Sequence, residues 1–125
     1  MSQRQFTRVQ FNLGVQIQLP DFNHFSVESR DLSLNGIFVA SDTPLPIGTA
    51  CQITLFPAAG LGVPSFHITG EVVRVEETGL GMKFTEIPQG SKYHLYELML
   101  SQIQDPDNIK QEFETVQKNK DIFML

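Results

Sequence analysis

The chain has 125 residues, 41% of them apolar and 18% charged, which is the composition of one folded domain with a sizeable core. Its formal net charge of −5 argues against broad binding to DNA or RNA, because such binding depends on many phosphate contacts from Lys and Arg. The one cysteine, Cys51, excludes an internal disulfide and favours a reducing compartment.

The sequence contains no stretch as long as a membrane span, and its first residues lack the apolar core of a signal peptide. We therefore expect a cytoplasmic protein without membrane insertion. Three of the four arginines, Arg4, Arg8 and Arg30, fall within the first thirty residues. A local positive site in an acidic protein suits a small anion better than a nucleic-acid polymer.

Alternation of apolar and polar residues predicts a strand over residues 9–19. Further strands are predicted over residues 22–30, 36–40, 49–55, 66–75 and 80–84. In the fifth strand the apolar phase changes near Val73, which indicates a β-bulge or burial on both faces. Six short strands separated by turns favour an antiparallel barrel or sandwich.

The pattern changes to helical spacing after Pro88. Ser91 is the expected N-cap of a first helix with the apolar residues Leu95, Leu98, Met99 and Ile103. A second helix is predicted from Asp105 and Pro106, with an apolar stripe of Ile109, Phe113 and Val116. The predicted organisation is therefore a domain of residues 1–104 that includes the first helix, followed by a second helix and tail in residues 105–125. The second helix and the apolar tail 122–125 must pack on the barrel, on a partner or on another copy.

Asp31-Leu32-Ser33-Leu34-Asn35-Gly36 combines a carboxylate and a hydroxyl with a turn signal. Asp31 and Ser33 are two residues apart, so in an extended chain their side chains point to the same side. Asn35 and Gly36 both tolerate positive φ and favour a tight turn. The stretch should present the Asp31 and Ser33 side chains at the surface, on one face, before it enters the apolar strand 36–40.

Arg4 and Arg8 bracket Gln5-Phe6-Thr7 ahead of the first strand. Either stretch alone is ordinary, since two arginines four apart are usually a solvated pair and Asp, Ser, Asn and Gly commonly make turns. Together, an arginine arm and an Asp/Ser shelf could recognise an anion that also carries hydrogen-bond donors. A guanine nucleotide has both properties.

In this order, ahead of an all-β pattern, the two stretches resemble the signature of the PilZ domain family, RxxxR followed by [D/N]xSxxG. Arg4 to Arg8 and Asp31 to Gly36 match it at every defining position, and residues 79–84 are similar to the family's usual last strand. The resemblance covers about residues 4–104 and indicates a stand-alone, single-domain protein. It implies a mainly β fold, a six-stranded antiparallel split β-barrel followed by C-terminal α-helices.

The resemblance also implies that the ligand is the second messenger cyclic di-GMP, bound by Arg4, Arg8, Asp31, Ser33 and Gly36. Arg makes bidentate contacts to a guanine edge or to phosphate, Asp31 could accept from guanine N1 and N2, and Ser33 could add a hydroxyl contact. The protein would be a receptor without catalytic residues or cofactor, and not an enzyme. It would signal through an unidentified partner protein in motility, adhesion, secretion or biofilm formation, as a monomer or a homodimer.

Two other functions are compatible with a small barrel. One is a PilZ-like interaction module that acts without ligand, for example in type IV pilus assembly, which the intact motifs disfavour. The other is a barrel that binds single-stranded nucleic acid. Its stacking aromatics should lie among basic residues, whereas Phe11, Phe38 and Phe66 fall on apolar runs.

The remaining candidate sites are weaker. His24, His67 and His94 lack metal-ligand spacing, and Cys51 lies on an apolar strand that favours a core position. Glu76-Glu77 is interpreted as a solvated turn. The glycine-rich residues 59–62 lack the Lys-Ser/Thr of a phosphate loop. We therefore predict no metal site.

Two further expectations concern the arm. In the family, the residue before the first arginine influences whether one ligand or a stacked pair is bound, and the uncharged Gln3 favours one. Residues 1–8 contain few apolar anchors, and without ligand Arg4 and Arg8 would face each other's charge with no anionic partner. We therefore expect the arm to be mobile without ligand and to fold over the barrel when ligand supplies partners.

Overall fold

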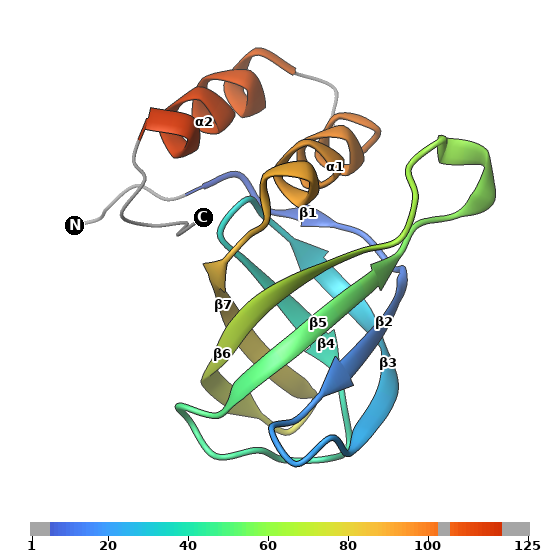
Figure 1. The fold of residues 1–125 in the computed structure, drawn as a ribbon, viewed down its shortest axis with the longest axis vertical. Helices are drawn as coiled ribbons and strands as arrows, with labels where there is room; N and C mark the ends of the chain where they lie inside the picture. The colour runs from blue at the N-terminus through green and yellow to red at the C-terminus, as the bar shows by residue number, and fades with distance from the viewer. Residues whose placement is uncertain (1–5, 103–105, 119–125) are drawn as a thin grey trace.

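The computed structural model describes residues 6–102 and 106–118, and it places two helices over one end of an antiparallel β-barrel (Figure 1). The strands are β1 (Val9–Gln10), β2 (Gly14–Gln18), β3 (His24–Leu32), β4 (Gly36–Ala40), β5 (Ala50–Phe56), β6 (Phe66–Glu76) and β7 (Gly79–Glu86). A short 3₁₀ turn, η1 (Ala59–Leu61), lies between β5 and β6. The helices α1 (Gln89–Leu100) and α2 (Pro106–Lys118) follow the last strand.

The barrel closes because β3 pairs with both β2 and β4. Its six strands run in the order β3-β2-β5-β6-β7-β4, and all neighbours are antiparallel. The extra strand β1 pairs with the end of β3, where Val9 lies opposite Leu32 and Gln10 opposite Asp31. The predicted mainly β fold with a six-stranded antiparallel barrel is confirmed, and a seventh short strand is added to it.

The first predicted strand is divided in two, so the prediction of one continuous strand over residues 9–19 is wrong. The cause is Ser29 on β3, a fully buried residue whose hydroxyl donates to the Phe11 carbonyl oxygen and accepts from the Leu13 N–H. These contacts satisfy the backbone between β1 and β2. Val15 and Ile17 are still buried on the predicted inward face.

The strands bury the alternating side chains that the sequence indicates. On β5 these are Cys51, Ile53 and Leu55. On β6 the pairing with β7 shifts register between Val72 and Arg74, which confirms a bulge at the predicted change of phase. Val73, the residue between them, is exposed.

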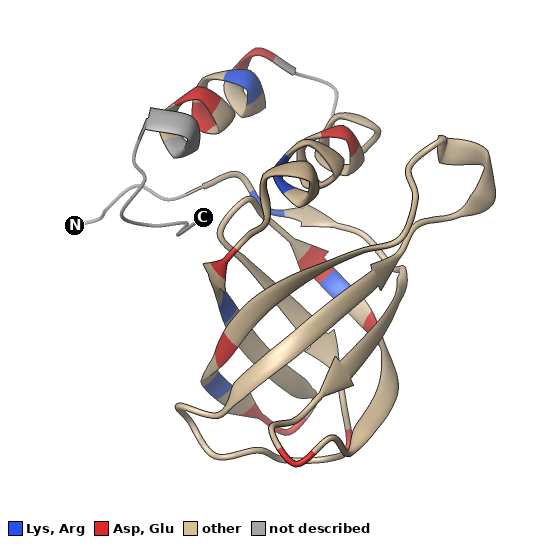
Figure 2. Cartoon of the chain, viewed as in Figure 1, with Lys and Arg blue, Asp and Glu red and all other residues tan. Residues whose placement is uncertain are grey.

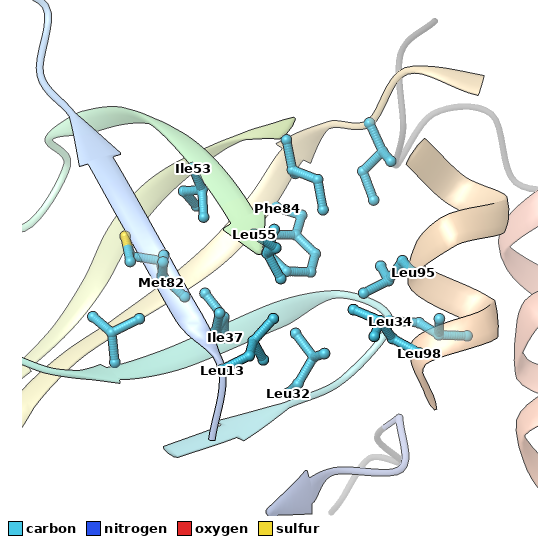
Figure 3. Close-up of a cluster of buried hydrophobic side chains, with 14 of the residues drawn as sticks. Leu13, Leu32, Leu34, Ile37, Ile53, Leu55, Met82, Phe84, Leu95 and Leu98 are labelled. Atoms are coloured by element: carbon cyan, nitrogen blue, oxygen red, sulfur yellow. The ribbon is translucent and has the colours of Figure 1, made fainter. Parts of the chain in front are cut away.

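Helix α1 closes one end of the barrel. Leu95 and Leu98 are buried and lie beside Leu34 from the β3–β4 turn (Figure 3). The helix begins at Gln89, and Ser91 donates its hydroxyl to the His67 carbonyl oxygen at 2.9 Å. The prediction that Ser91 caps the helix is therefore wrong, because its hydroxyl tethers α1 to β6.

Helix α2 packs against α1 through aromatic side chains. The Phe113 ring stacks on Tyr96, with centroids 4.2 Å apart and an interplanar angle of 11°, and lies 5.4 Å from Tyr93. Ile109 and Phe113 are buried, as predicted for the apolar stripe. The other predicted apolar positions, Ile103, the side chain of Val116 and the tail 122–125, lie outside the described residues. Within the described part of the chain, neither helix has the length and apolar character needed to span a membrane.

Candidate functional site

The two stretches singled out in the sequence meet in the fold. Arg8 lies directly before β1, and Asp31 lies near the end of β3, one position beyond where the prediction ended that strand. Since β1 pairs with β3, Arg8 reaches Asp31, and its Nη1 lies 2.5 Å from Asp31 Oδ1. The side chains are 48% and 26% exposed, so the pair is open to solvent. Arg4 and Gln3 lie outside the described residues.

This ion pair changes one expectation about the arm. Without ligand, Arg8 was expected to have no anionic partner, and that is wrong, because Asp31 takes the role. A pair this exposed to solvent contributes about 0–1 kcal/mol to stability. A ligand that offers an anion to Arg8 and a donor to Asp31 can therefore replace the contact at little cost.

The turn between β3 and β4 is built inside the protein. Ser33 is fully buried, and its hydroxyl donates to Asn35 Oδ1 at 2.8 Å and accepts from the Asn35 N–H at 3.3 Å. The Ser33 N–H donates to the Gly36 carbonyl oxygen at 2.9 Å. The expectation that the Ser33 hydroxyl lies on the surface is wrong, because the turn uses it internally.

Gly36 lies where a side chain would clash with the neighbouring strand. A Cβ at this position would lie 2.7 Å from the Met82 carbonyl oxygen, so β4 and β7 approach too closely for a side chain. Among the described residues, positive φ occurs at Phe22, Gly48 and Gly62. The turn at Asn35 and Gly36 therefore forms without the positive φ that both residues tolerate, and Gly36 allows the close packing of β4 on β7.

An open hollow of about 200 Å³ lies beside this turn. It contains three basic side chains, and the described residues that line it include no acid: Arg8, Asn35, Gly36, Ile37, Phe38, Val73, Arg74, Gly81, Met82 and Lys83. Figure 2 shows blue positions on β6 and β7 along one side of the barrel. The lining of the hollow is therefore cationic, and Arg8 and Arg74 each have an acidic partner beside it, Asp31 and Glu76.

Strand register brings these residues together. Lys83 lies opposite Gly36, and Gly81 lies between Phe38 on β4 and Arg74 on β6. The Arg74 guanidinium carbon is 5.3 Å from the centroid of the Phe38 ring, and its Nε is 2.7 Å from Glu76 Oε2. Sequence reasoning missed Phe38, Arg74 and Lys83 as site residues, because no local signal shows which strands face the arm.

The arm also contacts α2, a second feature that sequence reasoning missed. The Thr7 N–H donates to both carboxylate oxygens of Glu112, at 2.9 and 3.0 Å, and the Thr7 hydroxyl donates to Oε2 at 2.5 Å. The residue before Arg8 is thus bonded to the C-terminal helix.

Other reactive groups stay apart from this site. Cys51 is buried, and burial raises the pKa of its thiol, so the group is a neutral core residue as predicted. His94 faces Glu97 at 3.2 Å on α1. Within residues 6–102 and 106–118, no group of three or more His, Cys, Asp or Glu is arranged to hold a metal ion.

Comparison with known proteins identifies a family. The sequence model of the PilZ domain matches residues 2–101, most of the chain. No curated protein matches the sequence.

Solved structures share the fold at low sequence identity. The PilZ domain of Escherichia coli YcgR with c-di-GMP has a TM-score of 0.65 at 17% identity, covering 94% of this chain and 99% of that one. The PilZ domain of CeSA from a cellulose-synthesizing bacterium has a TM-score of 0.61 at 15% identity, covering 76% and 96%. The Bacillus subtilis inhibitor of motility MotI/DgrA has a TM-score of 0.66 at 19% identity, covering 91% of this chain and 53% of that one, so this chain spans about half of MotI.

Proposed function

This chain belongs to the PilZ domain family, and from that premise we propose that it is a receptor for cyclic di-GMP. In this proposal Arg4, Arg8 and Asp31 bind the nucleotide directly, while Ser33 and Gly36 shape the turn beside it. The protein acts in the cytoplasm, performs no chemistry on the ligand and passes the signal to a partner protein.

The observation that carries the proposal is the contact between Arg8 and Asp31 at the edge of a cationic hollow. A guanine base presents acceptors at O6 and N7 and donors at N1 and N2. Arg8 can donate to the acceptors or to phosphate, and Asp31 can accept from the donors, so one ligand satisfies both partners of the ion pair.

The hollow supplies the remaining requirement, which is compensation of the two phosphate charges. Arg74 and Lys83 both line it, together with Arg8. The Arg74 guanidinium is held over the Phe38 ring. Its planar surface is suited to stacking on a base. These residues are the ones we add to the site that the signature defines.

Signalling follows in this proposal from replacing the Arg8–Asp31 pair by ligand contacts. The arm then has new partners, and the surface around β1 and the β3–β4 turn changes with it. Regulation of motility, adhesion, secretion or biofilm formation is the expected setting, since MotI, a structural neighbour, is described as an inhibitor of motility.

Isothermal titration calorimetry of the full chain with cyclic di-GMP tests the proposal. We expect saturable binding of one ligand per chain. Cyclic di-AMP should not bind, because it lacks the guanine N–H groups that can donate hydrogen bonds to Asp31. A ratio of two ligands per chain would contradict the expectation from Gln3 while leaving the receptor function in place. Absence of binding would favour the ligand-independent interaction module.

A further inference from the structure

Helix α2 is attached to the arm by a polar contact between residues that are far apart in the chain. Three hydrogen bonds join Thr7 to Glu112, a separation of 105 residues. The family match ends at residue 101, before α2 begins at Pro106. Thr7 therefore lies within the stretch that the family model matches, and Glu112 lies outside it.

Glu112 is held in place by the packing of its helix. Its neighbour Phe113 stacks on Tyr96, and Ile109, one turn earlier, is fully buried. A carboxylate on a helix fixed in this way loses little further freedom when it accepts the bonds from Thr7. Glu114, two residues further on, is exposed on the same helix.

The contact fixes the chain on one side of Arg8, and the sheet fixes it on the other. Thr7 is bound to Glu112, and Val9 is paired with Leu32 of β3. The backbone of Arg8 is thus restrained from both directions, and its side chain lines the hollow. Restraining a binding group before the ligand arrives removes part of the ordering cost of binding.

We propose that Glu112 is a positioning residue for cyclic di-GMP binding, because it holds the arm so that Arg8 faces the hollow. This inference rests on the proposed function. By thermodynamic linkage, a ligand that favours the docked arm also favours docked α2. The bound protein therefore presents its partner with an α2 that is more firmly packed, and does not release that helix.

The negative charge of Glu112 has an effect on affinity opposite to that of positioning the arm, and the experiment must separate the two. Glu112 carries a negative charge near a site for an anion, so its removal also reduces repulsion of the ligand. Glu114→Ala changes the net charge by the same amount on the same helix without touching Thr7. The comparison of Glu112→Ala with Glu114→Ala therefore isolates most of the positioning effect.

The first test is cyclic di-GMP affinity by calorimetry. We expect Glu112→Ala to bind about 3- to 10-fold more weakly than Glu114→Ala, as the loss of a charge-assisted contact to a partly ordered arm would give. Glu112→Gln keeps an acceptor for the Thr7 N–H. Its affinity for cyclic di-GMP should therefore lie between that of Glu112→Ala and that of its own control, Glu114→Gln. This pair decides the question if Glu112→Ala proves poorly folded by circular dichroism.

The second test is hydrogen exchange of wild type with and without cyclic di-GMP. Amides of α2 should exchange more slowly when ligand is bound. Faster exchange in α2, or equal affinities for Glu112→Ala and Glu114→Ala, would overturn the positioning role while leaving the receptor function intact. Failure of wild type to bind cyclic di-GMP at all would overturn both proposals.

Discussion

The two motifs of the signature, the arginine pair and the stretch from Asp31 to Gly36, differ in which contacts fix them in the fold. Arg8 lies on an arm fixed by polar contacts, and its partner Asp31 is a carboxylate only partly covered by the protein. Ser33 and Gly36 belong to a turn whose groups are buried and used by the fold itself. In the proposed receptor, Arg8 and Asp31 supply binding contacts that can change without unfolding, and the turn of Ser33 and Gly36 fixes the geometry on which those contacts depend. Substitutions of the binding contacts and of the turn should separate affinity from stability.

The largest effect is expected for Arg8→Ala. Loss of the guanidinium removes charge-assisted contacts and should weaken cyclic di-GMP binding by about 30-fold or more, since each such bond contributes about 1.5–3 kcal/mol. Thermal unfolding should barely change, because the Asp31 pair is exposed. Arg30→Ala is the matched control, since Arg30 is exposed on β3 and does not line the hollow. Equal affinities of the two variants would remove Arg8 from the site.

Gly36→Ala should lower stability, in contrast to Arg8→Ala, which should lower affinity. The new Cβ would meet the Met82 carbonyl oxygen, and the strands must separate to admit it, at a cost of about 1–3 kcal/mol in the free energy of unfolding. Gly60→Ala is the control, because a Cβ there has nothing within 4 Å. Urea unfolding of both variants measures the difference, and equal stabilities would show that β4 and β7 adjust freely.

Ser33→Ala tests whether the buried Ser33 hydroxyl contributes to stability and not to affinity. Loss of its bonds to Asn35 should lower the free energy of unfolding by about 1 kcal/mol, because Asn35 can still be hydrated. Ser26→Ala, at an exposed site on β3, should have no such effect. If affinity falls more than tenfold while the unfolding midpoint stays unchanged, the hydroxyl reaches the ligand and the division between binding contacts and turn is wrong.

The smallest effect is expected for Arg74→Ala. The Arg74 guanidinium already forms an ion pair with Glu76 and lies over the Phe38 ring. A contact with an anion would therefore replace existing interactions. We expect binding to weaken about threefold, with a shallower dependence on salt. Calorimetry at two ionic strengths, with Arg30→Ala as the control again, measures both. An unchanged affinity and salt dependence would place the ligand away from β6.

The sequence predicts well the features that arise from local periodicity. Alternation predicts the barrel strands because burial repeats every two residues, and Ile109 and Phe113 identify the buried face of α2. The joint motif also predicts that Arg8 and Asp31 lie together, as the structure shows.

What the sequence did not predict depends on contacts between distant residues. The break after β1 is caused by Ser29, and Ser91 is diverted from capping by the His67 carbonyl oxygen. Arg74 reaches the hollow through the register of β6 with β7, and Glu112 meets Thr7 only because α2 folds back. Local propensity carries no information about such pairings.

The aromatic packing between α1 and α2 has a spectroscopic consequence. The chain contains no tryptophan, and its two tyrosines, Tyr93 and Tyr96, both lie against Phe113. Near-ultraviolet emission of the native protein therefore originates at one helix junction. An unlabelled sample thus carries its own optical probe of whether the C-terminal helix is seated, and this signal can be followed in stopped-flow experiments while the nucleotide is added.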